Sequence, residues 1–202
     1  MSGWITAEEI NTVYSVLNVE CKRGIRTKIN NRVIFALLLC GLRREEVTLV
    51  KMEDVFPEGD RPIIRLKKEY VKGKASKGRK RDVPIYWDVR STTYIINYYK
   101  MRIEEEDAQP NDPFVLNRLG KAYSLSGINR QYSSCISCLP DSRQAVLSPH
   151  SNRHSFCSHA LAVGHSPASV RDAAGHSSIA ITDIYAHSVE NRDLPSLYGE
   201  NG

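Results

Sequence analysis

SPHSNRHSFCSHALAVG, residues 148–164, is the stretch on which the interpretation of this sequence depends. A serine followed by proline is typical of a helix start, so Ser148 is predicted as the N-cap of a helix that runs to Gly164. His150 and Arg153 are three residues apart in the first turns, so their side chains share one face beside the positive end of the helix. Because the planar arginine fork suits two phosphate oxygens at once, this helix start is a candidate anion site.

The remaining sequence predicts a mostly α-helical fold with a small antiparallel β-sheet, an α+β class. Helices are predicted where apolar residues recur at helical spacing between capping residues. A sheet is predicted at residues 62–86, where two strand-like runs flank a Gly/Ser/Lys-rich turn. The predicted helices cover residues 6–19, 26–41, 43–52, 88–106, 124–138, 148–164, 167–175 and 175–188.

The turn of the predicted hairpin is strongly basic. Residues 65–81 contain nine Lys and Arg side chains and a single acid, while the whole chain has a net charge of +5. A solvated charged turn is the ordinary explanation, but such a turn also suits a polyanion such as DNA, and both can be true. The side chains expected to contact DNA are Lys72, Lys74, Lys77, Arg79, Lys80 and Arg81.

Cysteine content and hydropathy bear on the compartment. The chain has five cysteines, an odd count in a protein large enough to need no disulfides. Cys40 lies in an apolar run and is expected to pack there, and CISC at 135–138 is expected on a helix. No apolar run approaches the ~20 residues that span a membrane. We therefore expect no membrane association and a reducing cytoplasm, with association with the nucleoid if the source is prokaryotic.

Further polar residues complete a set with His150 and Arg153. Arg43 opens a short helix after Gly41, His176 lies in a Gly-Ser corner, and Tyr185 follows about two turns along the last helix. Each of these alone is better explained as a capping, surface or packing residue. Their joint order is not what packing requires. Two arginines and two histidines can clamp a phosphodiester, and a tyrosine can attack it as a nucleophile.

A metal site is a weaker alternative for the same helix. His150 and His154 share a helical face, and Cys157 and His159 follow closely. Zinc requires a closed tetrahedral ligand set, however, and Arg153 would intrude on it. We therefore predict no metal ligands among these residues, and assign His154 to structure or surface.

Three motifs together resemble the tyrosine recombinase (phage integrase) family: GLRREEVTLV, SPHSNRHSFCSHALAVG and GHSSIAITDIYAH. His150 precedes His176 by 176 − 150 = 26 residues and Tyr185 follows by 185 − 176 = 9, both common spacings in the family. The resemblance implies that Arg43 and Arg153 hold the scissile phosphate, while His150 and His176 hydrogen-bond it and manage the tyrosine proton. Tyr185 would then attack to give a 3′-phosphotyrosyl link.

The resemblance also implies a lysine general acid and a supporting carboxylate. The family's hairpin often places the lysine eight residues before the proline, and Ser76 stands eight before Pro84 here. Lys77 is the first candidate and Lys74 the second. Glu46 falls where the family often has a carboxylate. Because the phosphotyrosine conserves the bond energy, no metal or other cofactor is expected.

Domain organisation and partners follow from the same resemblance. We expect a catalytic domain at residues 1–190, a C-terminal tail at 191–202 and no separate N-terminal core-binding domain within this sequence, which is either a fragment or a small natural member. The expected partner is double-stranded DNA, bound by a homo-tetramer during synapsis and by a protein that is monomeric in isolation. Type IB topoisomerase activity and a catalytically silent DNA-binding protein remain as alternatives.

Overall fold

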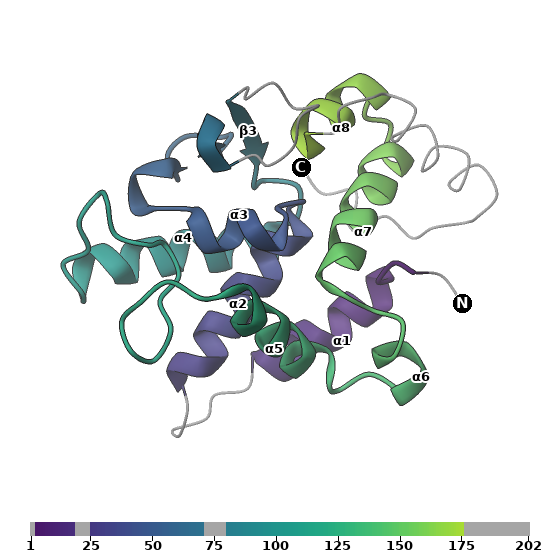
Figure 1. The fold of residues 1–202 in the computed structure, drawn as a ribbon. Coiled ribbons are helices and arrows are strands. Elements are labelled where there is room, and N and C mark those ends of the chain that lie inside the picture. Colours follow the sequence, from purple (N-terminus) through teal and green to yellow (C-terminus); the bar gives the residue numbers. More distant parts are fainter. Residues whose placement is uncertain (1–2, 19–24, 71–79, 176–202) are drawn as a thin grey trace.

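The computed structural model describes residues 3–18, 25–70 and 80–175 and is mostly helical (Figure 1). The prediction of a mostly α-helical fold with a small antiparallel sheet is confirmed. The last predicted helix and the tail lie outside the described residues. The elements are α1 (Ala7–Leu17), α2 (Ile25–Leu39), α3 (Arg44–Leu49), η1 (Met52–Asp54), β1 (Val55–Phe56), β2 (Ile63–Leu66), η2 (Lys68–Tyr70), β3 (Arg81–Pro84), α4 (Val89–Glu104), α5 (Leu125–Ile136), α6 (Asp141–Gln144), α7 (Pro149–Ala162) and α8 (Pro167–Ala174).

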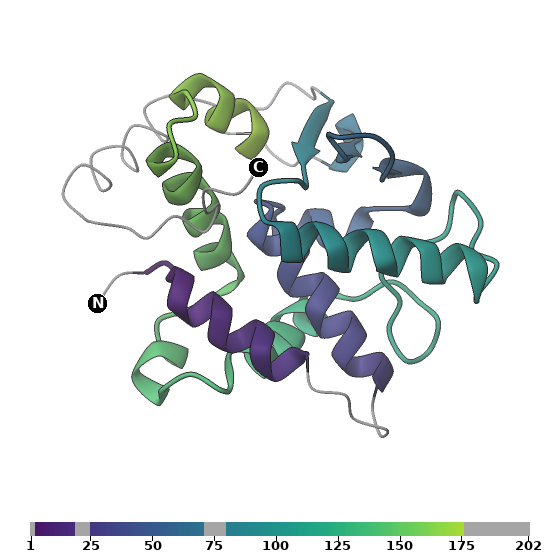
Figure 2. The same cartoon turned by 180° about the vertical axis from the view of Figure 1, so that it is seen from behind.

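Helix α2 is the centre of the fold. Its apolar second half is buried, and every side chain from Val33 to Cys40 is at most 2% exposed. Helices α3 and α5 pack on one side of it and α1 and α4 on the other (Figures 1 and 2). A helix suits such a buried run because it pairs its own backbone polar groups. No helix of the described part is long and apolar enough to cross a membrane.

A glycine ends the central helix region and sets the direction of α3. Gly41 has a φ of +89°, and a Cβ added to it would lie 2.8 Å from Cδ1 of Phe156 on α7. A side chain at this position would therefore both strain the backbone and collide with α7. The sequence predicts a helix at residues 43–52 that Arg43 opens; in the structure Arg43 is the N-cap residue of the shorter α3, which begins at Arg44 and ends at Leu49.

The sheet has three antiparallel strands in the order β1-β2-β3, with Ile64 opposite Val83 in its centre. The sequence predicts two longer strands, and the structure differs in two ways. The first is the short strand β1, which pairs with β2. The second is that residues 68–70 form a 3-10 turn, in which the Tyr70 hydroxyl donates to Asp54 at 3.0 Å and draws the chain away from the strand direction.

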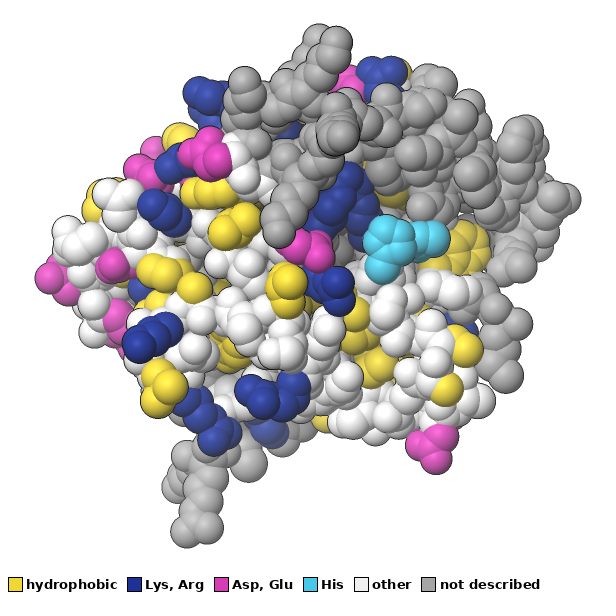
Figure 3. All heavy atoms as spheres, in the orientation of Figure 1, with side chains coloured by type: hydrophobic (Ala, Val, Ile, Leu, Met, Phe, Trp, Pro, Cys, Tyr) yellow, Lys and Arg dark blue, Asp and Glu magenta, His cyan; other side chains and the backbone are white. Residues whose placement is uncertain are grey.

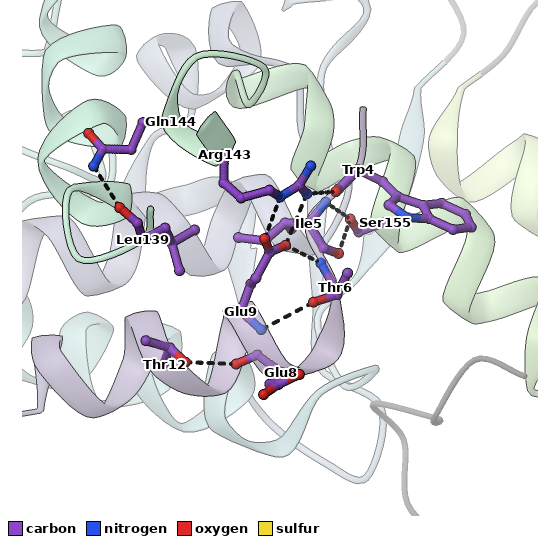
Figure 4. Close-up of polar contacts among 10 residues, drawn as sticks. All are labelled: Trp4, Ile5, Thr6, Glu8, Glu9, Thr12, Leu139, Arg143, Gln144 and Ser155. Carbon is purple, nitrogen blue, oxygen red and sulfur yellow. Dashed lines mark hydrogen bonds and ion pairs between the residues drawn. The ribbon is translucent and has the colours of Figure 1, made fainter. Parts of the chain in front are cut away.

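The N-terminal segment is fixed to α7 by buried polar contacts and to α6 by a partly buried ion pair (Figure 4). The Ile5 N–H donates to the Ser155 hydroxyl at 2.9 Å, and that hydroxyl donates to the Ile5 carbonyl at 2.7 Å. Thr6 and Glu9 form the predicted capping box, and Glu9 also pairs with Arg143. These contacts join α1 to the helix that carries His150 and Arg153.

The described cysteines are free thiols. Cys40 is buried, as its apolar surroundings predict. Cys135 lies on α5, whereas Cys138 follows the end of that helix. The prediction of two helical cysteines in the CISC stretch is therefore confirmed for the first only.

Candidate active site

Three arginines from distant parts of the chain converge on the C-terminal end of α8. Arg43 comes from the start of α3, Arg81 from the start of β3 and Arg153 from α7. Each guanidinium donates a hydrogen bond to a backbone carbonyl in residues 173–175. The pairs are Arg81 with Ala173 at 2.7 Å, Arg153 with Ala174, and Arg43 with Gly175 at 2.8 Å.

The chemistry of a helix end explains this convergence. The last carbonyls of a helix lack intrahelical donors and form the negative end of the helix dipole. A guanidinium group supplies both the missing hydrogen-bond donors and a positive charge beside the negative end of the dipole. Gly175 makes the close approach feasible because it adopts a φ of +66° and has no side chain. The end of α8 therefore holds three cations close together.

Glu46 is the buried carboxylate of this cluster, with a side chain only 1% exposed. One of its oxygens, Oε1, accepts from Nη1 of Arg43 at 2.9 Å. The other, Oε2, accepts from Nη2 of Arg81 at 2.5 Å and from the backbone N–H of Arg43 at 2.7 Å. This carboxylate thus links two of the arginines, and its expected supporting role stays a prediction.

The cluster has more positive than negative charge. Arg43, Arg81 and Arg153 contribute three positive charges against the single negative charge of Glu46, a difference of two. Burial, followed by the nearby Arg43 and Arg81, lowers the pKa of Arg153 to about 9. Burial is also the main cause of a lowered pKa at Arg81. An anion beside these groups would relieve their repulsion, so the cluster is a candidate anion site.

His150 lies next to the arginine cluster in the first turn of α7. The residue is exposed at the surface. Partial burial of the imidazole, followed by the nearby Arg153 and Arg43, nevertheless lowers its pKa below the ordinary value. A neutral imidazole is therefore favoured near pH 7, with one nitrogen that donates and one that accepts a hydrogen bond. Figure 3 shows histidine side chains exposed beside basic side chains on this face.

His154 lies beside His150, with ring centroids 4.5 Å apart in an edge-on arrangement. Partial burial and the neighbouring His150 and Arg153 lower its pKa to about 4. The sequence assigned His154 to structure or surface, and its spacing of four residues from His150 was the signal for this contact. Among the described residues, no three metal-binding side chains come close enough together to hold an ion.

The structure places Arg81 differently from the sequence interpretation, which grouped it with the exposed basic turn. Arg81 is only 7% exposed, whereas the neighbouring Lys80 is exposed. Strand periodicity could have revealed this, since Arg81 and the buried Val83 face the same side of β3. Arg81 therefore belongs to the arginine cluster.

Several residues of the expected site lie outside the described residues. Of the residues with a predicted role in catalysis, the structure brings together Arg43, Glu46, His150 and Arg153, and Arg81 joins them. The roles of all site residues stay predictions. The members outside the described part are Lys72, Lys74, Lys77, Arg79, His176 and Tyr185.

Comparison with known proteins identifies the family of this arrangement. Residues 3–192 match the phage integrase family. The chain belongs to this family. It is 29% identical over 177 residues to the tyrosine recombinase XerC of Vibrio cholerae serotype O1, a match that covers 85% of this chain and 51% of the relative. A second relative is the tyrosine recombinase XerC of Proteus mirabilis, 24% identical over 194 residues, with 94% of this chain and 57% of the relative covered. The chain thus spans about half the length of the curated relatives that it matches.

Solved structures of the family share the fold. The crystal structure of XerA recombinase has a TM-score of 0.69 at 19% identity, and the match covers 96% of this chain and 60% of the XerA chain. The post-cleavage complex of XerH recombinase with a palindromic difH substrate has a TM-score of 0.69 at 20% identity, and the match covers 94% of this chain and 50% of the XerH chain. A Tn1549 transposon integrase bound to transposon right end DNA has a TM-score of 0.66 at 17% identity, with 92% and 62% covered. The family resemblance predicted from the three motifs is confirmed.

Proposed function

We propose that this chain is the catalytic part of a site-specific DNA recombinase, which cleaves and rejoins DNA strands through a 3′-phosphotyrosyl intermediate. The observation that carries this proposal is the cluster of Arg43, Arg81 and Arg153 around Glu46, with its excess of two positive charges. A phosphodiester is the anion that family membership and the basic hairpin both favour. The outcome would be DNA integration, excision or inversion, as in a mobile element.

Arg43, Arg153 and His150 suit the binding of the phosphate. Arg43 has a side chain 32% exposed, so it can turn toward a ligand while Glu46 retains one of its nitrogens. Arg153 is buried, and its described contacts with Gly41 and Ala174 engage two of the five N–H donors of a guanidinium. These arginines would neutralise the charge that grows on the phosphoryl oxygens in the transition state.

The proposed reaction is a transesterification. The hydroxyl oxygen of Tyr185 attacks phosphorus and its proton passes to a histidine, with His150 and His176 as the candidates. The bond from phosphorus to the 5′ oxygen breaks, and that oxygen takes a proton from Lys77 or Lys74 as general acid. A phosphotyrosyl ester replaces the DNA ester, so no bond energy is lost and the reverse attack by a 5′ hydroxyl restores the strand.

The partners follow from this chemistry. Double-stranded DNA is the proposed substrate, with Lys72, Lys74, Lys77, Arg79 and the exposed Lys80 on its phosphates. Strand exchange needs paired sites, so a homo-tetramer on DNA is proposed, with a monomer in isolation. The proposed catalytic domain is residues 1–190, followed by a C-terminal tail at 191–202. We propose that the protein acts in the cytoplasm or at the nucleoid.

The test is covalent adduct formation on suicide DNA. The 202-residue protein is incubated at low salt with nicked, labelled duplexes whose central sequence is randomised, and adducts are separated under denaturing conditions. We expect a labelled protein band with the wild type and none with Tyr185→Phe, which keeps the ring and removes the nucleophile. A band that persists in Tyr185→Phe, or no band from wild-type protein that binds the same duplexes, would refute the mechanism.

A further inference from the structure

Arg81 occupies an unusual position for a strand residue. It lies at the start of β3 with 7% of its surface exposed, and its guanidinium reaches two other elements. Nη2 donates to Glu46 on α3 and Nη1 donates to the carbonyl of Ala173 on α8. One side chain thus joins the sheet to both elements that hold Arg43.

The contact between Arg81 and Glu46 fixes the orientation of the Glu46 carboxylate. Arg81 and the backbone N–H of Arg43 occupy Oε2, which leaves Oε1 to the guanidinium of Arg43. If Arg81 were absent, the carboxylate could rotate and the Arg43 guanidinium would lose its fixed acceptor. The orientation of Arg43 therefore depends on a residue that the anion need not touch.

Packing at the end of α8 strengthens the link. A Cβ on Gly175 would lie 2.7 Å from Cδ and 3.0 Å from Nε of Arg81, so the arginine stem lies directly against this glycine. The carbonyl of the same Gly175 accepts from Arg43. Arg81 thus borders both acceptors of the Arg43 guanidinium, namely the Glu46 carboxylate and the Gly175 carbonyl.

A purely structural role would not require a charge at this position. Burying an arginine against a carboxylate is no more stable than packing apolar side chains of similar size. The alternating burial of β3 would accept an apolar residue beside the buried Val83. The planar fork of arginine, in contrast, can hold a carboxylate and a carbonyl in fixed relative positions.

We propose that Arg81 is a positioning residue of the phosphate site, which fixes Glu46 and the end of α8 so that Arg43 is held in place for the anion. The proposal rests on the proposed function and deepens it. Arg81 acts through Glu46, because its two terminal nitrogens donate to the Glu46 carboxylate and to the Ala173 carbonyl.

The first test is a double-mutant cycle with inorganic phosphate as the probe. Phosphate is titrated into the 202-residue protein at constant ionic strength, and affinity is measured by calorimetry or by NMR. Arg81→Lys keeps the charge and loses the fork, so we expect roughly tenfold weaker binding, the size of one lost charge-assisted hydrogen bond. In an Arg43→Gln background the same change should have no further effect, since its route to the anion is gone.

A matched control is available on the neighbouring strand. Arg65→Lys makes the same chemical change at an exposed residue that pairs with Asp82, and phosphate affinity should stay at the wild-type value. Equal weakening of phosphate binding by Arg81→Lys in the wild-type and Arg43→Gln backgrounds would overturn the positioning role. Absence of phosphate binding by the wild type would instead count against the anion site, and hence against the proposed function.

Glu46→Gln provides a second test that does not depend on the folding of an Arg81 variant. Removal of a negative charge near an anion site would by itself strengthen phosphate binding. The positioning role predicts the opposite, about tenfold weaker binding, because neither arginine then has its ionic partner. The adduct assay should show a lower rate of covalent adduct formation at saturating DNA for Glu46→Gln and Arg81→Lys, with little change in DNA affinity. Tighter phosphate binding by Glu46→Gln would overturn the proposal.

Discussion

Two helix-ending glycines allow the contact between Arg81 and α8 to be measured. Gly175 follows α8 with a φ of +66°, and Gly164 follows α7 with a φ of +90°. An alanine at either position would carry the strain of a left-handed backbone, about 1–2 kcal/mol. The two sites differ in their surroundings, so the second glycine serves as a control for the first.

The difference between the sites comes from Arg81. At Gly175 a Cβ would lie 2.7 Å from Cδ of Arg81, whereas at Gly164 no described atom lies within 4 Å. Arg81 cannot move aside without weakening its hydrogen bonds to Glu46 and Ala173. Loss of one hydrogen bond to a charged group costs about 1.5–3 kcal/mol. Gly175→Ala should therefore cost about 2.5–5 kcal/mol in total, against about 1–2 kcal/mol for Gly164→Ala.

Urea unfolding of the wild type and both variants measures the two costs directly, provided that the slopes agree. Phosphate affinity should fall in Gly175→Ala, because its carbonyl is the acceptor of Arg43, and stay unchanged in Gly164→Ala. If Gly175→Ala is no more destabilising than Gly164→Ala, Arg81 is not held against this glycine, and the account of the arginine cluster is wrong.

Two further predictions concern the attachment of the N-terminal segment. Ser155→Ala should lower the free energy of urea unfolding by about 1–3 kcal/mol, because the buried Ile5 N–H and carbonyl both lose their partner. The control Ser15→Ala, at an exposed hydroxyl on α1, should change this free energy by less than about 0.5 kcal/mol. Equal effects of the two substitutions would contradict the contact between Ser155 and Ile5. Burial raises the pKa of Glu9, but hydrogen bonds and charge from Arg143 outweigh it and hold the pKa below 4.5. The ionised Glu9 therefore stabilises the fold fully above about pH 4.5, and this stabilisation is lost as pH falls through the pKa of Glu9 in the folded protein. Glu9→Gln should flatten the acid part of the plot of unfolding free energy against pH. Parallel plots for the wild type and Glu9→Gln in acid would contradict the pairing with Arg143.

Local chemistry explains which elements the sequence predicts well. Thr6 with Glu9, Asp88 and Ser124 each cap a helix whose start agrees with the prediction. These signals depend on residues within one turn of each other, so no tertiary contact is needed to read them. The spacing of His150 and Arg153 is local in the same sense, and three short motifs together were enough to predict the family.

Other elements depend on distant partners, and the sequence predictions for them are incomplete. Strand β1 has two residues and exists through its pairing with β2. Helix α6 is a single turn without a side-chain cap, so no pattern marked it. The turn at residues 68–70 depends on a buried carboxylate at Asp54. Short elements have too few residues for a period to be visible.

The sequence by itself determined the helical architecture, the family motifs and the identity of Arg43, His150 and Arg153 as members of a candidate site, because these rest on short-range spacing. Only the tertiary structure decided that Arg81 joins them in the interior. Its hydrogen bond to Ala173 spans 92 residues, and its ion pair with Glu46 spans 35. A basic residue in a basic stretch predicts a surface position, and burial was decided by the carboxylate and the helix end that folding brought to it, since a buried charge is stable only beside such partners.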